Sequence, residues 1–122
     1  MVFADASEDL DDVGKNIEVV ALHGERVLSG THTILATRRD ARIIVGFGGY
    51  LFRSERVREQ IRREAQGSKV YGISSGRLAN VNVCFPAKEA EQQKIAACLT
   101  SLDEWIAAEG RELEALRVHK KG

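Results

Sequence analysis

The sequence predicts an α+β protein, with a small, mostly β body followed by one long C-terminal helix. Three observations lead to this prediction. The length of 122 residues suits one domain with an added helix. Residues 13–87 contain short β-branched runs separated by turn residues. Residues 88–122, which begin just after Pro86, have the periodicity of a helix.

The predicted helix over residues 88–122 has the repeat of a coiled coil. Large apolar side chains recur at alternating steps of four and three residues, a pattern interrupted once by the polar Glu109. These residues, called the helix seam below, are Ile95, Leu99, Leu102, Ile106, Leu113 and Leu116. At about 1.5 Å per residue the helix would be roughly 50 Å long, which is more than the remaining residues could cover.

An isolated helix buries none of these seam side chains, and its own propensity leaves it marginally stable. We therefore expect the seam to be a helix-pairing interface, with a second copy of the chain or with another protein. The alternative is a single helix folded back on its own domain.

The rest of the chain is expected to form short elements. The first twelve residues are interpreted as a loose acidic lead-in, and Ser54 as the cap of a helix over Glu55–Ala65 with arginines on its outer faces. A single helical turn is expected at Arg77–Asn80. Ala41–Phe52 is ambiguous, because its β-branched residues favour a strand whereas its three glycines favour neither state. The segments with strand-like composition are Ile17–Leu22, Arg26–Ser29, Thr31–Thr37, Lys69–Ile73 and Val81–Phe85.

The net charge of zero hides an uneven distribution along the chain. The charge is −5 over residues 1–12, +6 over residues 13–87 and −1 over residues 88–122. A positive central segment is compatible with a polyanionic partner such as nucleic acid. It is equally typical of arginine-rich helix faces that are only solvated.

No constellation of residues predicts catalysis. The three histidines, His23, His32 and His119, are scattered, and Ser74 and Ser75 have no evident base. The glycine-rich segment 46–49 lacks the lysine and the serine or threonine of a phosphate loop, so close backbone packing is the simpler interpretation. We therefore expect a protein that is not an enzyme, with no cofactor and no metal.

The remaining sequence features indicate a cytoplasmic protein. No apolar run is long enough to cross a bilayer, and the acidic start does not have the architecture of a signal peptide. Cys84 and Cys98 have neither metal-ligand nor redox spacing, so we expect two buried thiols of a cytosolic protein.

A motif at the start of the predicted helix resembles a known family. Pro86 is followed by Glu91–Ala96, which reads EQQKIA, and then by the seam. Together with the preceding residues, this combination resembles the end of a target recognition domain and the following spacer helix of type I restriction–modification specificity subunits. The other matching pieces are Gly67-Ser68, Ile73-Ser74, Leu78 and Val81–Phe85, with looser likeness at Ser29–Leu35 and Tyr50–Ala65. The resemblance covers most of the chain after about residue 13.

The resemblance implies a non-catalytic function in DNA recognition. Subunits of that family carry two recognition domains, each followed by a spacer helix. The two helices pair antiparallel, and methyltransferase subunits dock on the resulting frame. By this resemblance, we expect the chain to have one shortened recognition domain, residues 13–87, and one spacer or dimerisation helix, residues 88–122.

Two functions follow from the resemblance. In the first, the chain assembles as a homodimer, or with a full-length specificity subunit or methyltransferase subunits, and modulates DNA target recognition. In the second, it is a DNA-binding half-subunit that reads one half-site, as a homodimer, in a working methyltransferase complex.

Candidate DNA contacts lie mainly on the loop-rich stretch after Gly67. Lysine and arginine contact phosphates or guanine edges, and serine contacts either. The candidates are Lys69, Tyr71, Ser74, Ser75 and Arg77, with Arg38, Arg39 and Arg42 as a second basic cluster.

Overall fold

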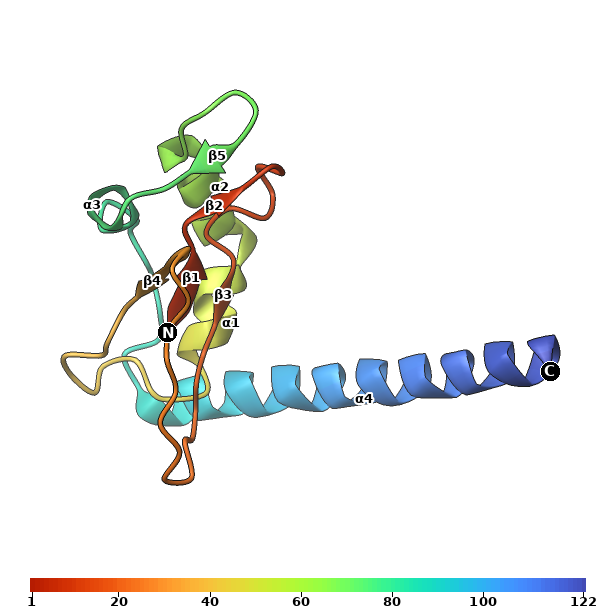
Figure 1. The fold of residues 1–122 in the computed structure, drawn as a ribbon. Coiled ribbons are helices and arrows are strands. Elements are labelled where there is room, and N and C mark those ends of the chain that lie inside the picture. Colours follow the sequence, from red (N-terminus) through yellow and green to blue (C-terminus); the bar gives the residue numbers. More distant parts are fainter.

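A computed structural model describes residues 1–122 and confirms the α+β class. Two small antiparallel sheets and three short helices form the body, and one long helix leaves it (Figure 1). The strands are two or three residues long, so the body is less rich in β structure than the sequence predicts.

The first sheet is built around the N-terminus of the chain. Strand β1 (Val2–Ala4) is its centre, with β3 (Asn16–Ile17) and β4 (Thr33–Leu35) antiparallel on either side. Phe3 is only 2 % exposed, and its ring meets that of Phe52 edge to face at 5.2 Å. The prediction of a loose acidic lead-in over residues 1–12 is therefore wrong, because apolar residues ahead of the acids form the central strand.

The second sheet joins the segment after β1 to a distant part of the chain. Strand β2 (Ala6–Ser7) pairs antiparallel with β5 (Tyr71–Gly72), and the Ile73 N–H extends the contact by donating to the Asp5 carbonyl at 2.8 Å. Gly67, ahead of β5, has a φ of +137°, and a Cβ there would lie 1.9 Å from the Val70 carbonyl oxygen. Only glycine therefore fits this turn.

Three short helices complete the body. They are α1 (Gly48–Arg53), α2 (Glu55–Glu64) and α3 (Ser75–Leu78). Helix α2 confirms the prediction for residues 55–65, and its Val57 and Ile61 pack with Val13 and Ile73 as the buried core. The ambiguous segment 41–52 is resolved as a turn leading into α1.

Three of the predicted strands are shortened and two are absent. Strands β3, β4 and β5 cover only parts of the predicted segments, and residues 26–29 lie in a long loop without strand pairing. Val20 and Leu28 in this loop are exposed. Without a surface on which to bury these side chains, the strand propensity of the segment has no effect. Residues 81–85 also lack strand pairing.

Helix α4 (Glu89–Lys121) confirms the prediction for residues 88–122. Its first turns lie against the base of the body, and the rest of the helix projects into solvent (Figure 1). No helix of the protein combines the length and the apolar character that a membrane crossing requires.

Candidate interaction surfaces

The base of α4 is fixed by one buried side chain. Gln92 is 0 % exposed and makes three hydrogen bonds. Its Oε1 accepts from the Ile44 N–H at 3.0 Å, and its Nε2 donates to the carbonyls of Arg42 and Pro86, both at 2.7 Å. The first turns of α4 are thereby tied to the loop before α1 and to the segment that enters the helix.

A second contact holds α4 farther along its length. Tyr50, in α1, donates its hydroxyl to Asp103 Oδ2 at 2.8 Å and lies 3.1 Å from Thr100 Oγ1. Asp103 is three turns beyond Gln92, a distance of roughly 16 Å along the helix axis. Two attachment points this far apart define the direction in which α4 leaves the body.

The helix seam lies largely in solvent. Leu99 is half-buried, whereas the other five seam residues are between 39 and 68 % exposed. The alternative of a helix folded back on its own domain is therefore wrong. Trp105 beside the seam is also exposed, and its Nε1–H donates to Glu109 Oε1 at 3.1 Å. The one polar seam position thus has a partner within the same helix.

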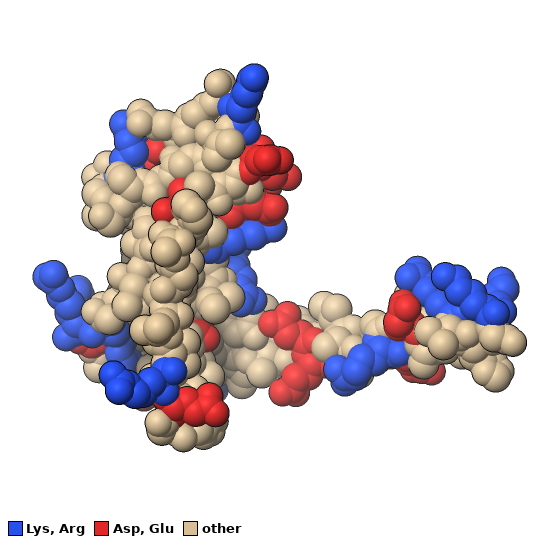
Figure 2. Space-filling view, in the orientation of Figure 1, with Lys and Arg blue, Asp and Glu red and all other residues tan.

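Charge is unevenly distributed along α4. Residues 89–104 hold four acids and one base, a net charge of −3, and residues 105–121 hold three acids and four bases, a net charge of +1. Figure 2 shows acidic side chains on the half nearer the body and a basic cluster at the far end. A second helix of this kind would match these charges only in the antiparallel orientation.

The first group of predicted DNA contacts lies around β5 and α3. Lys69 and Ser75 are exposed, and Tyr71 is half-buried in β5. Ser74 caps α3 by accepting from the Arg77 N–H at 3.2 Å. The Arg77 guanidinium is 3.5 Å from the carboxylate of Glu64. Ser74 and Arg77 therefore have structural partners, which leaves Lys69 and Ser75 as the accessible members of the group.

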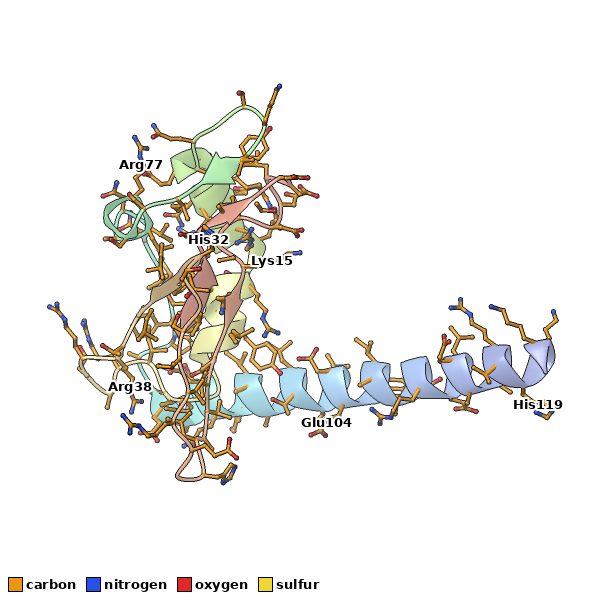
Figure 3. The ribbon with its side chains drawn as sticks, in the orientation of Figure 1. Lys15, His32, Arg38, Arg77, Glu104 and His119 are labelled. Carbon is orange, nitrogen blue, oxygen red and sulfur yellow. The ribbon has the colours of Figure 1, made fainter.

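The second group lies elsewhere on the body. Figure 3 labels Arg38 near the base of α4 and Arg77 at the other end, so the structure does not bring the two groups together. Arg42 is paired with Asp40 at 2.9 Å, and Arg38 donates to the Ile43 carbonyl at 3.2 Å. The Arg42 backbone N–H, helped by its guanidinium, lowers the pKa of Asp40. Arg39 is exposed.

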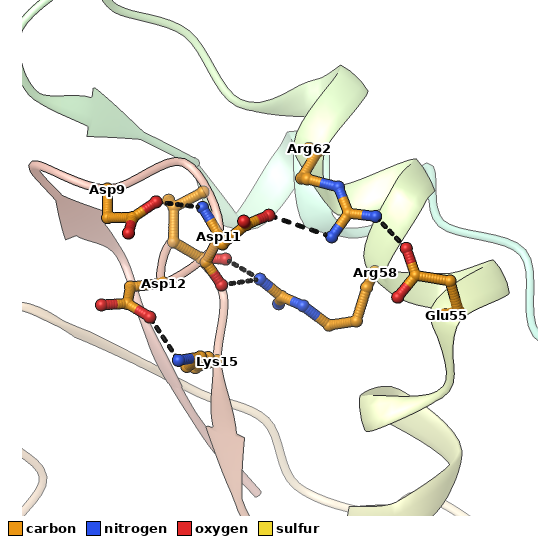
Figure 4. A network of polar contacts seen from close by, with 8 residues as sticks. Asp9, Asp11, Asp12, Lys15, Glu55, Arg58 and Arg62 are labelled. Carbon is orange, nitrogen blue, oxygen red and sulfur yellow. Dashed lines mark hydrogen bonds and ion pairs between the residues drawn. The ribbon is translucent and has the colours of Figure 1, made fainter.

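A network of polar contacts joins residues 9–12, called the acidic turn below, to α2 (Figure 4). Arg58 is only 7 % exposed, and its Nη2 donates to the carbonyls of Asp11 and Val13, each at 2.8 Å. Burial, and secondarily the neighbouring Arg62, lowers the pKa of Arg58. Arg62 pairs with Asp11 and Glu55, and its hydrogen bond with Glu55 raises its pKa. The prediction that the arginines of this helix all lie on outer faces is wrong for Arg58.

The glycine-rich segment is occupied by a side chain of the protein itself. The two carboxylate oxygens of Glu18 accept from the N–H groups of Gly46 and Gly49 at 3.0 and 2.8 Å. Gly48 and Gly49 are buried, and a Cβ at Gly49 would lie 3.1 Å from Glu18. The interpretation as close backbone packing is confirmed for Gly48 and Gly49, whereas Gly46 has open space at its Cβ position and a φ of +93°.

The residues with reactive or ligand side chains are dispersed. Cys84 and Cys98 are both exposed, so the expectation of buried thiols is wrong. Cys84 lies in the segment that joins α3 to α4, and Cys98 lies on the solvent side of α4, between its two attachment points. No group of three or more histidine, cysteine, aspartate or glutamate residues is placed to hold a metal ion.

Comparisons with protein-family models, with curated proteins and with solved structures find no match for this chain. The interpretation of its function therefore depends on the residues and contacts described above.

Sequence reasoning missed the residues that hold α4 in place. Gln92 lies inside the EQQKIA motif, which is the one signal that could have indicated it. Gln93 next to it has the same chemistry and is exposed, so the motif does not say which glutamine is buried. Tyr50 and Asp103 are far apart in sequence and carry no pattern of their own.

Proposed function

We propose that this protein is a non-catalytic assembly component of a type I restriction–modification system, acting in the cytoplasm through its long helix. The observation that carries the proposal is an exposed apolar seam on a helix that Gln92 and Tyr50 hold away from the body. Each seam side chain contributes about 1.5–3 kcal/mol when fully buried, so a free seam favours association.

The proposed pairing is an antiparallel coiled coil. Coiled coils bury this kind of four-three seam, and the helix dipoles are also better placed when the chains run in opposite directions. In this arrangement the acidic half of one α4 faces the basic end of the other. The two bodies then lie at opposite ends of the helix pair, at a separation that is fixed by the attachment of α4.

The partner is a second copy or the spacer helix of a full-length specificity subunit. Burial of the seam does not favour a second copy of the chain over another protein, because any helix with a matching antiparallel register offers similar apolar area. Methyltransferase subunits that dock on such a frame are further partners. By occupying a spacer helix, the protein would modulate which DNA targets the complex recognises.

Substituting a seam residue tests the proposed pairing. We expect the unmodified protein to sediment as a dimer at about tens of micromolar, a concentration at which weak coiled coils persist. Leu102→Glu places a charge in the seam of both chains and is expected to give monomers. A solvent-face control on the same helix, Glu104→Gln, should remain dimeric. A monomeric unmodified protein would refute the pairing.

Co-purification tests the assignment to a restriction–modification system. Tagged protein should recover the specificity and methyltransferase subunits of its host, and a Leu99→Glu, Leu102→Glu variant should recover only background amounts. If the unmodified protein and the variant recover equal, background amounts of both subunits, regulation is ruled out and a self-contained homodimer is favoured.

The second candidate function is a half-site reader of DNA. Lys69 and Ser75 favour it, because both are exposed and they lie just before β5 and at the start of α3, two elements at the end of the body away from α4 (Figure 1). A binding titration over a range of salt concentrations separates the two functions. A reader binds its site with nanomolar affinity and discriminates between sequences, whereas an assembly component shows only weak attraction that falls steeply with salt.

A further inference from the structure

The segment Val81–Phe85 has the side-chain pattern of a strand but no partner strand. Val81, Val83 and Phe85 are half-buried, whereas Asn82 and Cys84 between them are exposed. Val81 and Val83 pack against the core of the body. Alternating burial of this kind is the pattern of a half-buried β-strand. The predicted strand is therefore present in its packing and absent only in its hydrogen bonding.

Gln60 occupies one edge of this segment at Asn82, and the other edge is free at Val83 and Phe85. Gln60 of α2 bonds the Asn82 backbone twice, accepting from its N–H at 2.8 Å and donating to its carbonyl at 2.9 Å. In an extended strand, successive residues direct their N–H and C=O groups to opposite edges. Val83 and Phe85 therefore direct theirs to the edge away from Gln60, and these groups have no hydrogen-bond partner within the protein.

A groove with a basic wall runs beside this segment. Its two walls are the residues Arg38, Arg39, Asp40, Arg42 and Ile43 on one side, and Val81, Asn82, Val83 and Phe85 on the other. The first wall holds three arginines and one aspartate, a net charge of +2. Basic side chains gather at the matching place in Figure 2, near the position at which Figure 3 labels Arg38.

We propose that this groove binds an extended acidic segment of another protein, which adds a β-strand to the free edge at Val83 and Phe85. Each of these two residues offers one N–H donor and one carbonyl acceptor, which is what the backbone of an added strand requires. Acidic side chains of the added strand would face the arginine wall. A nucleic acid fits less well, because a phosphate accepts hydrogen bonds but cannot donate to the two free carbonyls.

Amide hydrogen exchange on the full chain tests the proposal. The probe is a synthetic peptide of about eight residues, the length of an ordinary strand, in which glutamate alternates with valine. When it binds, exchange at the Val83 and Phe85 amides should slow by roughly tenfold or more, while exchange at Cys84, on the other edge, should not change. Equal protection of all three amides, or of none, would overturn strand addition.

Two matched sets of variants locate the contact. N-methylation at alternate positions removes the N–H donors from one edge of the peptide strand and leaves the other edge intact. The peptide whose intact edge faces Val83 and Phe85 should bind, and the peptide methylated on that edge should not. Arg39→Glu, at an exposed residue without an ion pair, should weaken binding of the acidic peptide by about tenfold. Arg56→Glu, at an exposed position of α2, should leave that affinity unchanged. If duplex DNA binds at Arg39 and the peptide does not bind at all, the arginine wall is a nucleic-acid contact and the proposal fails.

Discussion

Replacing Phe3 with alanine is expected to lower the free energy of unfolding by about 3–5 kcal/mol, the usual cost of removing a buried aromatic ring. Phe3 lies on the central strand of the main sheet, is almost completely buried and packs edge to face on Phe52. Its removal leaves a cavity between the sheet and α1. Urea denaturation monitored by circular dichroism measures the change, with an unchanged dependence on denaturant as the sign that the native state is intact.

Leu35→Ala is the matched control for this measurement. Leu35 belongs to the same sheet but is 62 % exposed, so the change in unfolding free energy should stay well below that of Phe3→Ala. If Phe3→Ala and Leu35→Ala lower the free energy of unfolding by the same small amount, the N-terminal segment is as loosely held as its acidic composition indicates. Because β1 lies within residues 1–12, deleting these residues would remove the central strand of the first sheet.

The elements that the sequence predicted well are those whose pattern depends on few distant residues. Helix α4 follows from its own repeat and from Pro86, and α2 follows from the spacing of Val57 and Ile61. The hydrophobic repeat of each of these helices lies within one continuous segment, so contacts with distant residues are not needed to predict the helix.

The elements that were missed depend on contacts across the chain. Strand β1 is three residues long and exists because β3 and β4 pair with it, and no local pattern shows that pairing. Residues 81–85 show the reverse case. There the local pattern is strand-like, but no other segment of the chain reaches their free edge. A strand needs a second segment to pair with, so the sequence of one segment does not determine whether it becomes a strand.

The candidate interaction surfaces also differ in how far a local sequence pattern defines them. The seam residues lie on the predicted helix, where spacing alone places them along one face, and the pairing of that face stays a prediction. The eight candidate DNA contacts were chosen by residue type, and the structure places them in two groups at different ends of the body. Arg58 was assigned to the surface because five arginines of the segment 53–63 look alike, yet its guanidinium bonds two carbonyls of the acidic turn.

Replacing Gln92 with leucine is expected to have the second large effect. Leucine fills a similar volume but bonds neither the Ile44 N–H nor the carbonyls of Arg42 and Pro86. Buried backbone groups without partners are costly, so we expect the free energy of unfolding to fall by about 2–4 kcal/mol. Gln93→Leu changes the exposed neighbour, whose side-chain amide bonds the exposed Glu89, and should cost far less.

The same substitution also tests whether α4 is a fixed spacer. Cys84 and Cys98 are exposed on either side of Gln92, so spin labels on these native thiols report how the helix sits on the body. In the unmodified protein and in Gln93→Leu, the distribution of label separations should be narrow, because Gln92 and Tyr50 hold α4 at two points. In Gln92→Leu only the Tyr50 contact is left, and the distribution should broaden. A distribution as narrow as that of the unmodified protein would mean that Gln92 stabilises the body without setting the direction of α4.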